Sequence, residues 1–194
     1  MKTSKLLTTG SIILLAAMLF AGCEGITHEP KVDMASLKPV TQEDFTSALK
    51  SINVDDSQIS SLDNTSFSFE GDSKEYEIVC NIDASSPSNN YYAYAKCVDA
   101  KTAKELFDYY YDLYDDVFDA ADFSGIKSYE TGTDTGYILI DGRLDDKKNN
   151  SYTPYHDAIY LKDDTVIVAM ASDYDVAIEK EVNNFLDALG YPHP

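Results

Sequence analysis

Apolar and polar residues follow two different spacings along this chain. At 76–82 and 91–98, apolar side chains alternate with polar ones, which is the spacing of a β-strand with one buried face. Between them, 83–90 is rich in serine, proline and asparagine, so we interpret the two strands as a hairpin with a long tip. Further strands are predicted at 126–130, 137–141, 158–161 and 166–170, and a short one around Phe67 and Phe69.

Apolar residues three or four positions apart predict three helices. The first follows Thr41-Gln42-Glu43-Asp44, which resembles a capping box. The second follows Asp99, which can cap it, and its stripe from Ala103 to Ala121 is the strongest helical pattern in the chain. The third extends over 175–189, and Gly190 provides a glycine stop.

The order of these elements is helix, strands, long helix, strands, helix. Segregated strands and helices favour an α+β fold rather than an alternating parallel one. We therefore predict a mostly antiparallel sheet packed against the long amphipathic helix, with shorter helices at both ends of a single domain, residues 41–194. Residues 23–40 contain two prolines and no sustained period, so we interpret them as a flexible tether.

The N-terminal segment consists of two lysines, an apolar run and two small residues before a cysteine. Lys2 and Lys5 precede the apolar run Leu6 to Phe20, and Ala21-Gly22 precedes Cys23. This arrangement resembles the lipobox signal peptide of bacterial lipoproteins. The resemblance implies that residues 1–22 are removed, that Cys23 carries lipid, and that the protein is anchored on the extracytoplasmic face of the cell membrane.

The composition is strongly acidic. Residues 1–22 contain two of the 15 basic residues and none of the 34 acidic ones, so their removal takes the formal net charge from −19 to −21. Such a surface repels phosphate backbones, which argues against nucleic acid as a partner. Arg143 is the only arginine in the sequence, so little of it is suited to bidentate anion recognition.

The lipobox, the order of elements, Thr41-Gln42-Glu43-Asp44-Phe45 and Leu189-Gly190-Tyr191 together resemble small Gram-positive surface lipoproteins that have no assigned activity. The resemblance implies a membrane-attached protein. We expect its partner to be a surface protein or a cell-wall component. The resemblance implies no catalytic residue. We expect no cofactor.

Cys80 and Cys97 are the two cysteines that remain if Cys23 is lipidated. They lie on the two strands of the predicted hairpin, in a domain expected outside the cytoplasm, so a cross-strand disulfide is one interpretation. Two buried free thiols are the other. The spacing along the chain is compatible with both interpretations.

Two further groups are candidate ligand sites. Tyr91, Tyr92 and Tyr94 follow a polar loop and could form an aromatic surface for a sugar ring or a peptide, or they could be ordinary half-buried sheet residues. Four acidic residues of the long helix are weak candidates for sharing a calcium ion, and a solvated helix face is the favoured interpretation: Asp112, Asp115, Asp116 and Asp119.

Motifs of nucleophilic, zinc-dependent and phosphate-binding enzymes are absent from the sequence. His156, beside Asp157, is the one histidine placed within the body of the domain, and it could serve a hydrolase together with a serine or a carboxylate. The sequence therefore favours a lipid-anchored extracytoplasmic binding or interaction module. A hydrolase acting on cell-wall or peptide substrates through His156 is the alternative.

Overall fold

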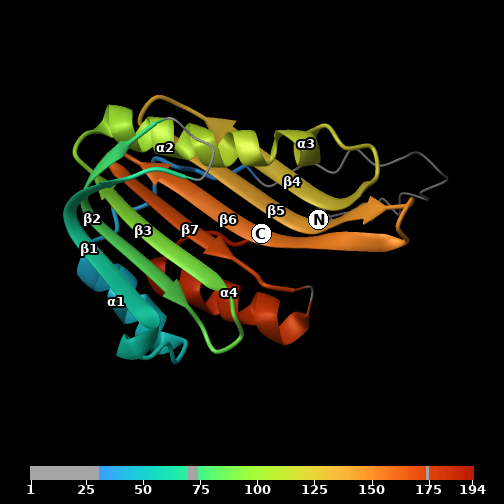
Figure 1. The fold of residues 1–194 in the computed structure, drawn as a ribbon, viewed down its shortest axis with the longest axis horizontal. Coiled ribbons are helices and arrows are strands. Elements are labelled where there is room, and N and C mark those ends of the chain that lie inside the picture. Colours follow the sequence, from blue (N-terminus) through green and yellow to red (C-terminus); the bar gives the residue numbers. More distant parts are fainter. Residues whose placement is uncertain (1–30, 70–73, 174) are drawn as a thin grey trace, which may run out of the picture.

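Seven antiparallel strands form one sheet in the computed structural model, which describes residues 31–69, 74–173 and 175–194 (Figure 1). The order across the sheet is β1-β2-β3-β7-β6-β5-β4, so β1 and β4 are its edges. The strands are β1 (Ile59–Phe67), β2 (Tyr76–Ser85), β3 (Tyr91–Cys97), β4 (Phe123–Thr131), β5 (Thr135–Asp146), β6 (Ser151–Lys162) and β7 (Thr165–Met170). The predicted α+β class and antiparallel sheet are confirmed.

Helices cover both faces of this sheet. In Figure 1, α2 and α3 lie on one face, and α1 and α4 lie on the other. Their bounds are α1 (Gln42–Ser51), α2 (Ala100–Leu113), α3 (Asp115–Phe118) and α4 (Val176–Leu189), and a 3₁₀ turn (Asp56–Gln58) precedes β1. The sheet therefore separates two hydrophobic cores, one beneath each pair of helices.

The predicted helix ends are confirmed where they depend on local hydrogen bonds. Thr41 Oγ1 accepts from the Asp44 backbone N–H over 3.1 Å, and the Asp44 carboxylate accepts from the Thr41 N–H, which completes the capping box. The carboxylates of Asp99 and Asp175 cap α2 and α4 by accepting from the backbone N–H groups of Thr102 and Ala177, respectively. Gly190 ends α4 with a φ of 73°, a left-handed conformation that favours glycine.

The long helix is shorter than its sequence pattern predicts. It ends at Leu113, and Tyr114, with φ −101° and ψ 2°, separates it from the short helix α3. The apolar spacing continues across the break because Tyr114 and Val117 are still buried in the same core. Acidic residues at this point also oppose the helix dipole, which favours an early end.

A β-bulge in β2 reverses which side chains face each core. The pairing with β3 shifts between Ile78 and Cys80. Before the bulge, Tyr76 and Ile78 face the α2 core, whereas Cys80 and Ile82 face the α1 and α4 core. The prediction that these four residues form one buried face is therefore wrong. One consequence is that the polar residues after the bulge turn towards α2.

Residues 31–40, which the sequence analysis assigns to the tether, lie against the domain. Val32, Met34 and Val40 are buried in the core beneath α1 and α4. Lys162 Nζ donates to the Met34 carbonyl over 3.1 Å, and Tyr191 Oη donates to the Lys38 carbonyl over 2.9 Å. The folded part of the described chain therefore includes residues 32–40. Residues 23–30 of the predicted tether lie outside the described residues.

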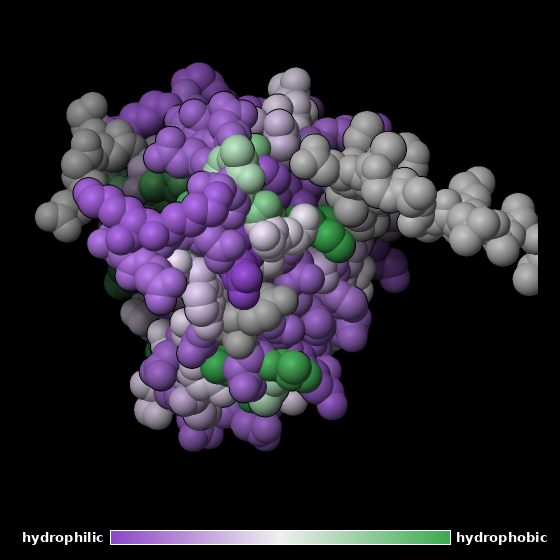
Figure 2. All heavy atoms as spheres, turned by 90° about the vertical axis from the view of Figure 1, so that its right-hand side faces the viewer, coloured by the Kyte–Doolittle hydropathy of each residue, from purple (hydrophilic) through white to green (hydrophobic). Residues whose placement is uncertain are grey.

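The surface of one end of the molecule is mostly hydrophilic, with small hydrophobic patches (Figure 2). This agrees with a sequence that has 34 acidic and 15 basic residues.

Candidate functional site

A pocket of about 290 Å³ lies between α2 and the β1-β2-β3 end of the sheet. Its floor is made by small and β-branched side chains of the central strands: Ala93, Ala95, Val166 and Val168. Leu106 and Tyr110 of α2 form one wall. The volume is close to the lower end of known small-molecule sites, roughly 300–1,000 Å³.

The alanines of β3 create this space. Ala93 and Ala95 point to the α2 side of the sheet, whereas Tyr92 and Tyr94, which alternate with them, point to the opposite side. A larger residue at either alanine would extend into the pocket. The alternation of small and large residues along β3 is therefore what leaves one face hollow and the other filled.

A chain of hydrogen-bonded polar groups lines one side of the pocket. Tyr91 Oη donates to Asp83 Oδ1 over 2.6 Å, and Asn81 Nδ2 donates to Asp83 Oδ2. The hydroxyls of Tyr91 and Tyr110 also interact with each other. Burial raises the pKa of Tyr91 and of Tyr110, and the charge of Asp83 raises both further, so both phenols are neutral at physiological pH.

Aromatic rings close another side of the pocket. Phe69 stacks on Tyr109 with ring centroids 3.9 Å apart, and its edge meets Tyr110 at 5.8 Å. Phe67 lies 5.3 Å from Phe69 in an edge-to-face arrangement. Leu62 of the edge strand β1 also lines the pocket and is 53% exposed. The pocket is thus mainly apolar with a few convergent polar groups, the usual character of a ligand site.

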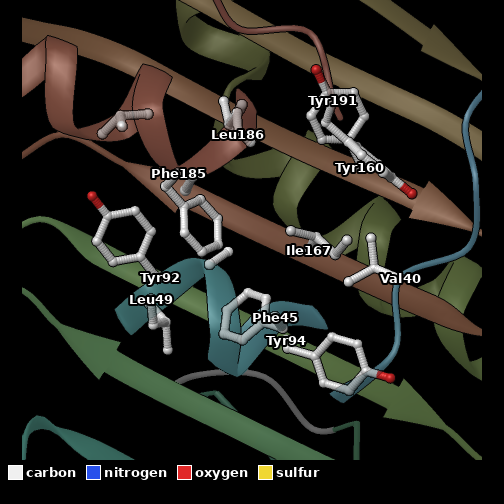
Figure 3. Close-up of a cluster of buried hydrophobic side chains, with 14 of the residues drawn as sticks. Val40, Phe45, Leu49, Tyr92, Tyr94, Tyr160, Ile167, Phe185, Leu186 and Tyr191 are labelled. Atoms are coloured by element: carbon white, nitrogen blue, oxygen red, sulfur yellow. The ribbon is translucent and has the colours of Figure 1, made fainter. Parts of the chain in front are cut away.

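Of the three tyrosines predicted as a ligand surface, only Tyr91 reaches this pocket. Tyr92 is fully buried against Phe185, with ring centroids 4.5 Å apart, and Tyr94 is buried 5.5 Å from Phe45 (Figure 3). Tyr92 also donates to Glu181 of α4 over 3.1 Å. Of the two interpretations of these tyrosines, the burial of Tyr92 and Tyr94 favours ordinary sheet residues over a shared ligand surface. They hold α1 and α4 on the sheet.

Sequence reasoning missed Asn81, Asp83 and Tyr110. Asp83 was assigned to a loop, but β2 continues to Ser85 and places Asn81 and Asp83 on one face, two residues apart. The spacing itself is visible in the sequence. The face of the sheet on which Asn81 and Asp83 lie depends on the bulge, and the contact between Asp83 and Tyr91 depends on the register of β2 and β3. Local spacing specifies neither the bulge nor the register.

His156 lies outside this pocket and is buried, with 4% of its surface exposed. Its Nδ1 lies 3.1 Å from Asp141 Oδ1, and its Nε2 lies 2.8 Å from Asn183 Oδ1. Burial lowers the pKa of His156, but the hydrogen bonds to Asp141 and Asn183 and the charge of Asp141 raise it overall above 6.5. Both ring nitrogens are already engaged, so the contacts around His156 argue against a serine-activating base.

Cys80 and Cys97 are free and buried, and they lie in different cores on opposite faces of the sheet. Cys97 is paired with Ile78 across the strands, whereas Cys80 is paired with Lys96. The bulge between the two positions produces this separation. Of the two interpretations of the sequence, this placement favours free thiols.

The acidic residues of the predicted long helix are divided between its two parts. Asp112 lies near the end of α2, Asp115 and Asp116 begin α3, and Asp119 follows α3. Across 31–69, 74–173 and 175–194, no three histidine, cysteine or acidic side chains are grouped as a metal site requires. The structure does not bring these four aspartates together as a ligand set.

A second hollow, of about 390 Å³, lies beside the start of α1 and is lined by residues that include Lys96 and Lys162. Each lysine already has a partner within the protein. Lys96 Nζ contacts Asp164 Oδ1 at 2.5 Å, and Lys162 Nζ donates to a backbone carbonyl. Because both lysines already have partners within the protein, this hollow is a weaker candidate than the pocket beside α2.

No family model matches the chain, and neither does any curated protein or solved structure. In the described ranges, no helix is both long and apolar enough to cross a membrane. The lipobox and Cys23 lie outside the described residues.

Proposed function

We propose that this protein is a lipid-anchored binding module on the extracytoplasmic face of the membrane, and that the pocket beside α2 holds its ligand. The observation that carries the proposal is the convergence of Asn81, Asp83, Tyr91 and Tyr110 on a mainly apolar cavity. Buried polar groups that meet at one cavity fix the orientation of a ligand. The lipobox resemblance supports the location.

In this proposal α2 is the amphipathic helix whose apolar stripe packs against the sheet. Leu106 and Tyr110 share a core with sheet residues such as Val166 and Val168, and the same four residues line the pocket. A pocket wall built on a helix and a sheet is held more precisely than one built on loops. The ligand would be a small molecule or a side chain presented by a partner at the cell surface.

A pocket-filling variant tests this proposal. Ala93→Leu places extra side-chain atoms in the cavity, so we expect binding of small fragments, followed by ligand-observed NMR, to fall by at least about tenfold. Ala188→Leu is the matched control, because Ala188 is exposed on α4, on the other face of the sheet. It should bind fragments as the wild type does. Binding that is equal in all three proteins, or absent from all, would refute the pocket as a ligand site.

A further inference from the structure

The charge that lines the pocket is negative. Among the described residues that line it, Asp83 is the only acidic one and none is basic. The two phenols beside Asp83 are neutral. The described part of the lining therefore presents one carboxylate and no cationic side chain. The overall net charge of −19 adds a negative potential that raises the local concentration of cations.

The carboxylate is held in a fixed position. Its two oxygens each accept one hydrogen bond from the protein, from Tyr91 Oη at Oδ1 and from Asn81 Nδ2 at Oδ2. An ionised carboxylate has about four lone-pair sites, so each oxygen retains capacity for another donor. A ligand that donates to Asp83 would meet an acceptor already oriented, which lowers the entropic cost of binding.

The remaining lining suits the body of an organic cation. Tyr110 and Phe69 provide aromatic rings, which attract cations at their faces. Ala93, Ala95 and Val168 provide an apolar floor for a hydrocarbon portion. An inorganic cation would use neither feature, because hard metal ions need several oxygen ligands.

We infer that this pocket binds a small organic amine, with its ammonium group on Asp83 and its hydrocarbon body over Ala93 and Ala95. This inference deepens the proposed function and rests on it. An anion is disfavoured because it would meet the Asp83 carboxylate, and no basic side chain among the described lining residues compensates for that repulsion. A neutral molecule of the same shape would gain the apolar contacts but only a weaker hydrogen bond to the carboxylate.

Three probes of one shape and different charge test the inference on the full-length protein in detergent. Benzylamine is cationic at pH 7.5, benzyl alcohol is neutral, and benzoate is anionic. Titration by NMR should give benzylamine the tightest binding, by about tenfold or more over benzyl alcohol, with benzoate the weakest. This comparison needs no variant, so it does not depend on whether a substitution folds.

Asp83→Asn then removes the charge while it keeps the shape. The preference for benzylamine over benzyl alcohol should disappear, while binding of benzyl alcohol is retained. Asp112→Asn is the matched control, since it removes one charge from an exposed position on α2 that does not line the pocket. It should keep the preference. Raising the salt concentration should weaken benzylamine binding and leave benzyl alcohol unaffected.

The outcomes separate the two proposals. If benzyl alcohol or benzoate binds as tightly as benzylamine, or if Asp83→Asn keeps the preference, the inference of an amine ligand is wrong and the pocket still stands as a binding site. If none of the probes and no fragment binds in the pocket, the proposed function itself fails.

Discussion

Tyr114 Oη donates a hydrogen bond to Asp157 Oδ2 over 2.8 Å, and both residues are buried. Tyr114 is the residue at which α2 ends and α3 begins, and Asp157 lies on β6. The neighbouring residue on the strand, His156, contacts Asn183 of α4 on the other face of the sheet. Two adjacent residues of one strand thus connect the sheet to a helix on each side.

The pH dependence of stability should reveal the buried Asp157. Burial raises the pKa of Asp157 to about 6, above about 3.9 in the unfolded chain. The folded state therefore holds the proton more tightly, and stability should fall as the pH rises from about 4 to 6, by up to about 3 kcal/mol. Urea unfolding across this range should show this fall, and Asp157→Asn should remove it. If the free energy of unfolding of Asp157→Asn falls with pH as steeply as that of the wild type, the prediction is contradicted.

Tyr114→Phe should destabilise the protein more at pH 7 than at pH 4. At pH 7 the variant leaves a buried carboxylate without its phenol donor, a loss of about 1.5–3 kcal/mol for a hydrogen bond to a charged group. At pH 4 Asp157 is protonated, and the loss should be about 1 kcal/mol. Urea unfolding at both pH values measures the difference. As a control, the same substitution in the Asp157→Asn background should cost equally at the two pH values.

His156 should titrate above its ordinary range in the folded protein. Because the folded-state pKa is raised, the resulting stability is fully present below about pH 6.5 and is lost as the pH rises through the folded-state value. NMR titration should show that Asp141→Asn lowers the pKa of His156. Asp145→Asn, on the same strand but paired with Arg143, is the control and should leave it unchanged. A His156 pKa unaffected by Asp141→Asn would contradict the assignment.

Helix caps and most strands could be predicted from the sequence because they depend on residues close together in the chain. Thr41 with Asp44 and Gly190 are such cases. The sequence predicts strand β1 only at its end near Phe67, because most of this edge strand is exposed and has no apolar alternation. The β5-β6 hairpin was underestimated for a related reason: its outer half is polar and exposed.

The candidate pocket could not be predicted because it depends on three non-local features. The bulge after Ile78 turns Asn81 and Asp83 towards α2, the register of β2 and β3 places Tyr91 beside Asp83, and α2 contributes Tyr110. Hydrophobic spacing specifies a buried face but not which layer covers it. The sequence indicates Tyr91 for its aromatic ring, whereas in the structure its hydroxyl donates to Asp83 in the pocket.

Lipidation at Cys23 should depend on the thiol. Cells that express the wild type should incorporate labelled fatty acid into the protein and retain it in the membrane fraction, whereas Cys23→Ala should lose both. Cys80→Ala is the control, because Cys80 is buried in the domain, and it should label as the wild type does. Labelled Cys23→Ala would refute the lipobox interpretation.

The two remaining cysteines should be reduced and protected. In Cys23→Ala, a thiol reagent should react with two groups after unfolding without a reductant, and only slowly in the native state at pH 8. Burial raises the pKa of Cys80, and burial together with Asp164 raises the pKa of Cys97 to about 12, so little thiolate is present. Absence of reactive thiols in the unfolded, unreduced protein would mean that a disulfide forms.

Gly136 of β5 should be intolerant of even one added methyl group. A Cβ at this position would lie 2.9 Å from the ring of Phe107, which is fully buried on α2. The helix approaches the sheet closely here because glycine leaves room for the ring. Gly136→Ala should therefore cost about 1–3 kcal/mol in urea unfolding. Phe107→Leu removes the clashing ring atoms, so the double variant should be less destabilised than the sum of the two single variants. Additive losses would show that the strain comes from the strand backbone instead.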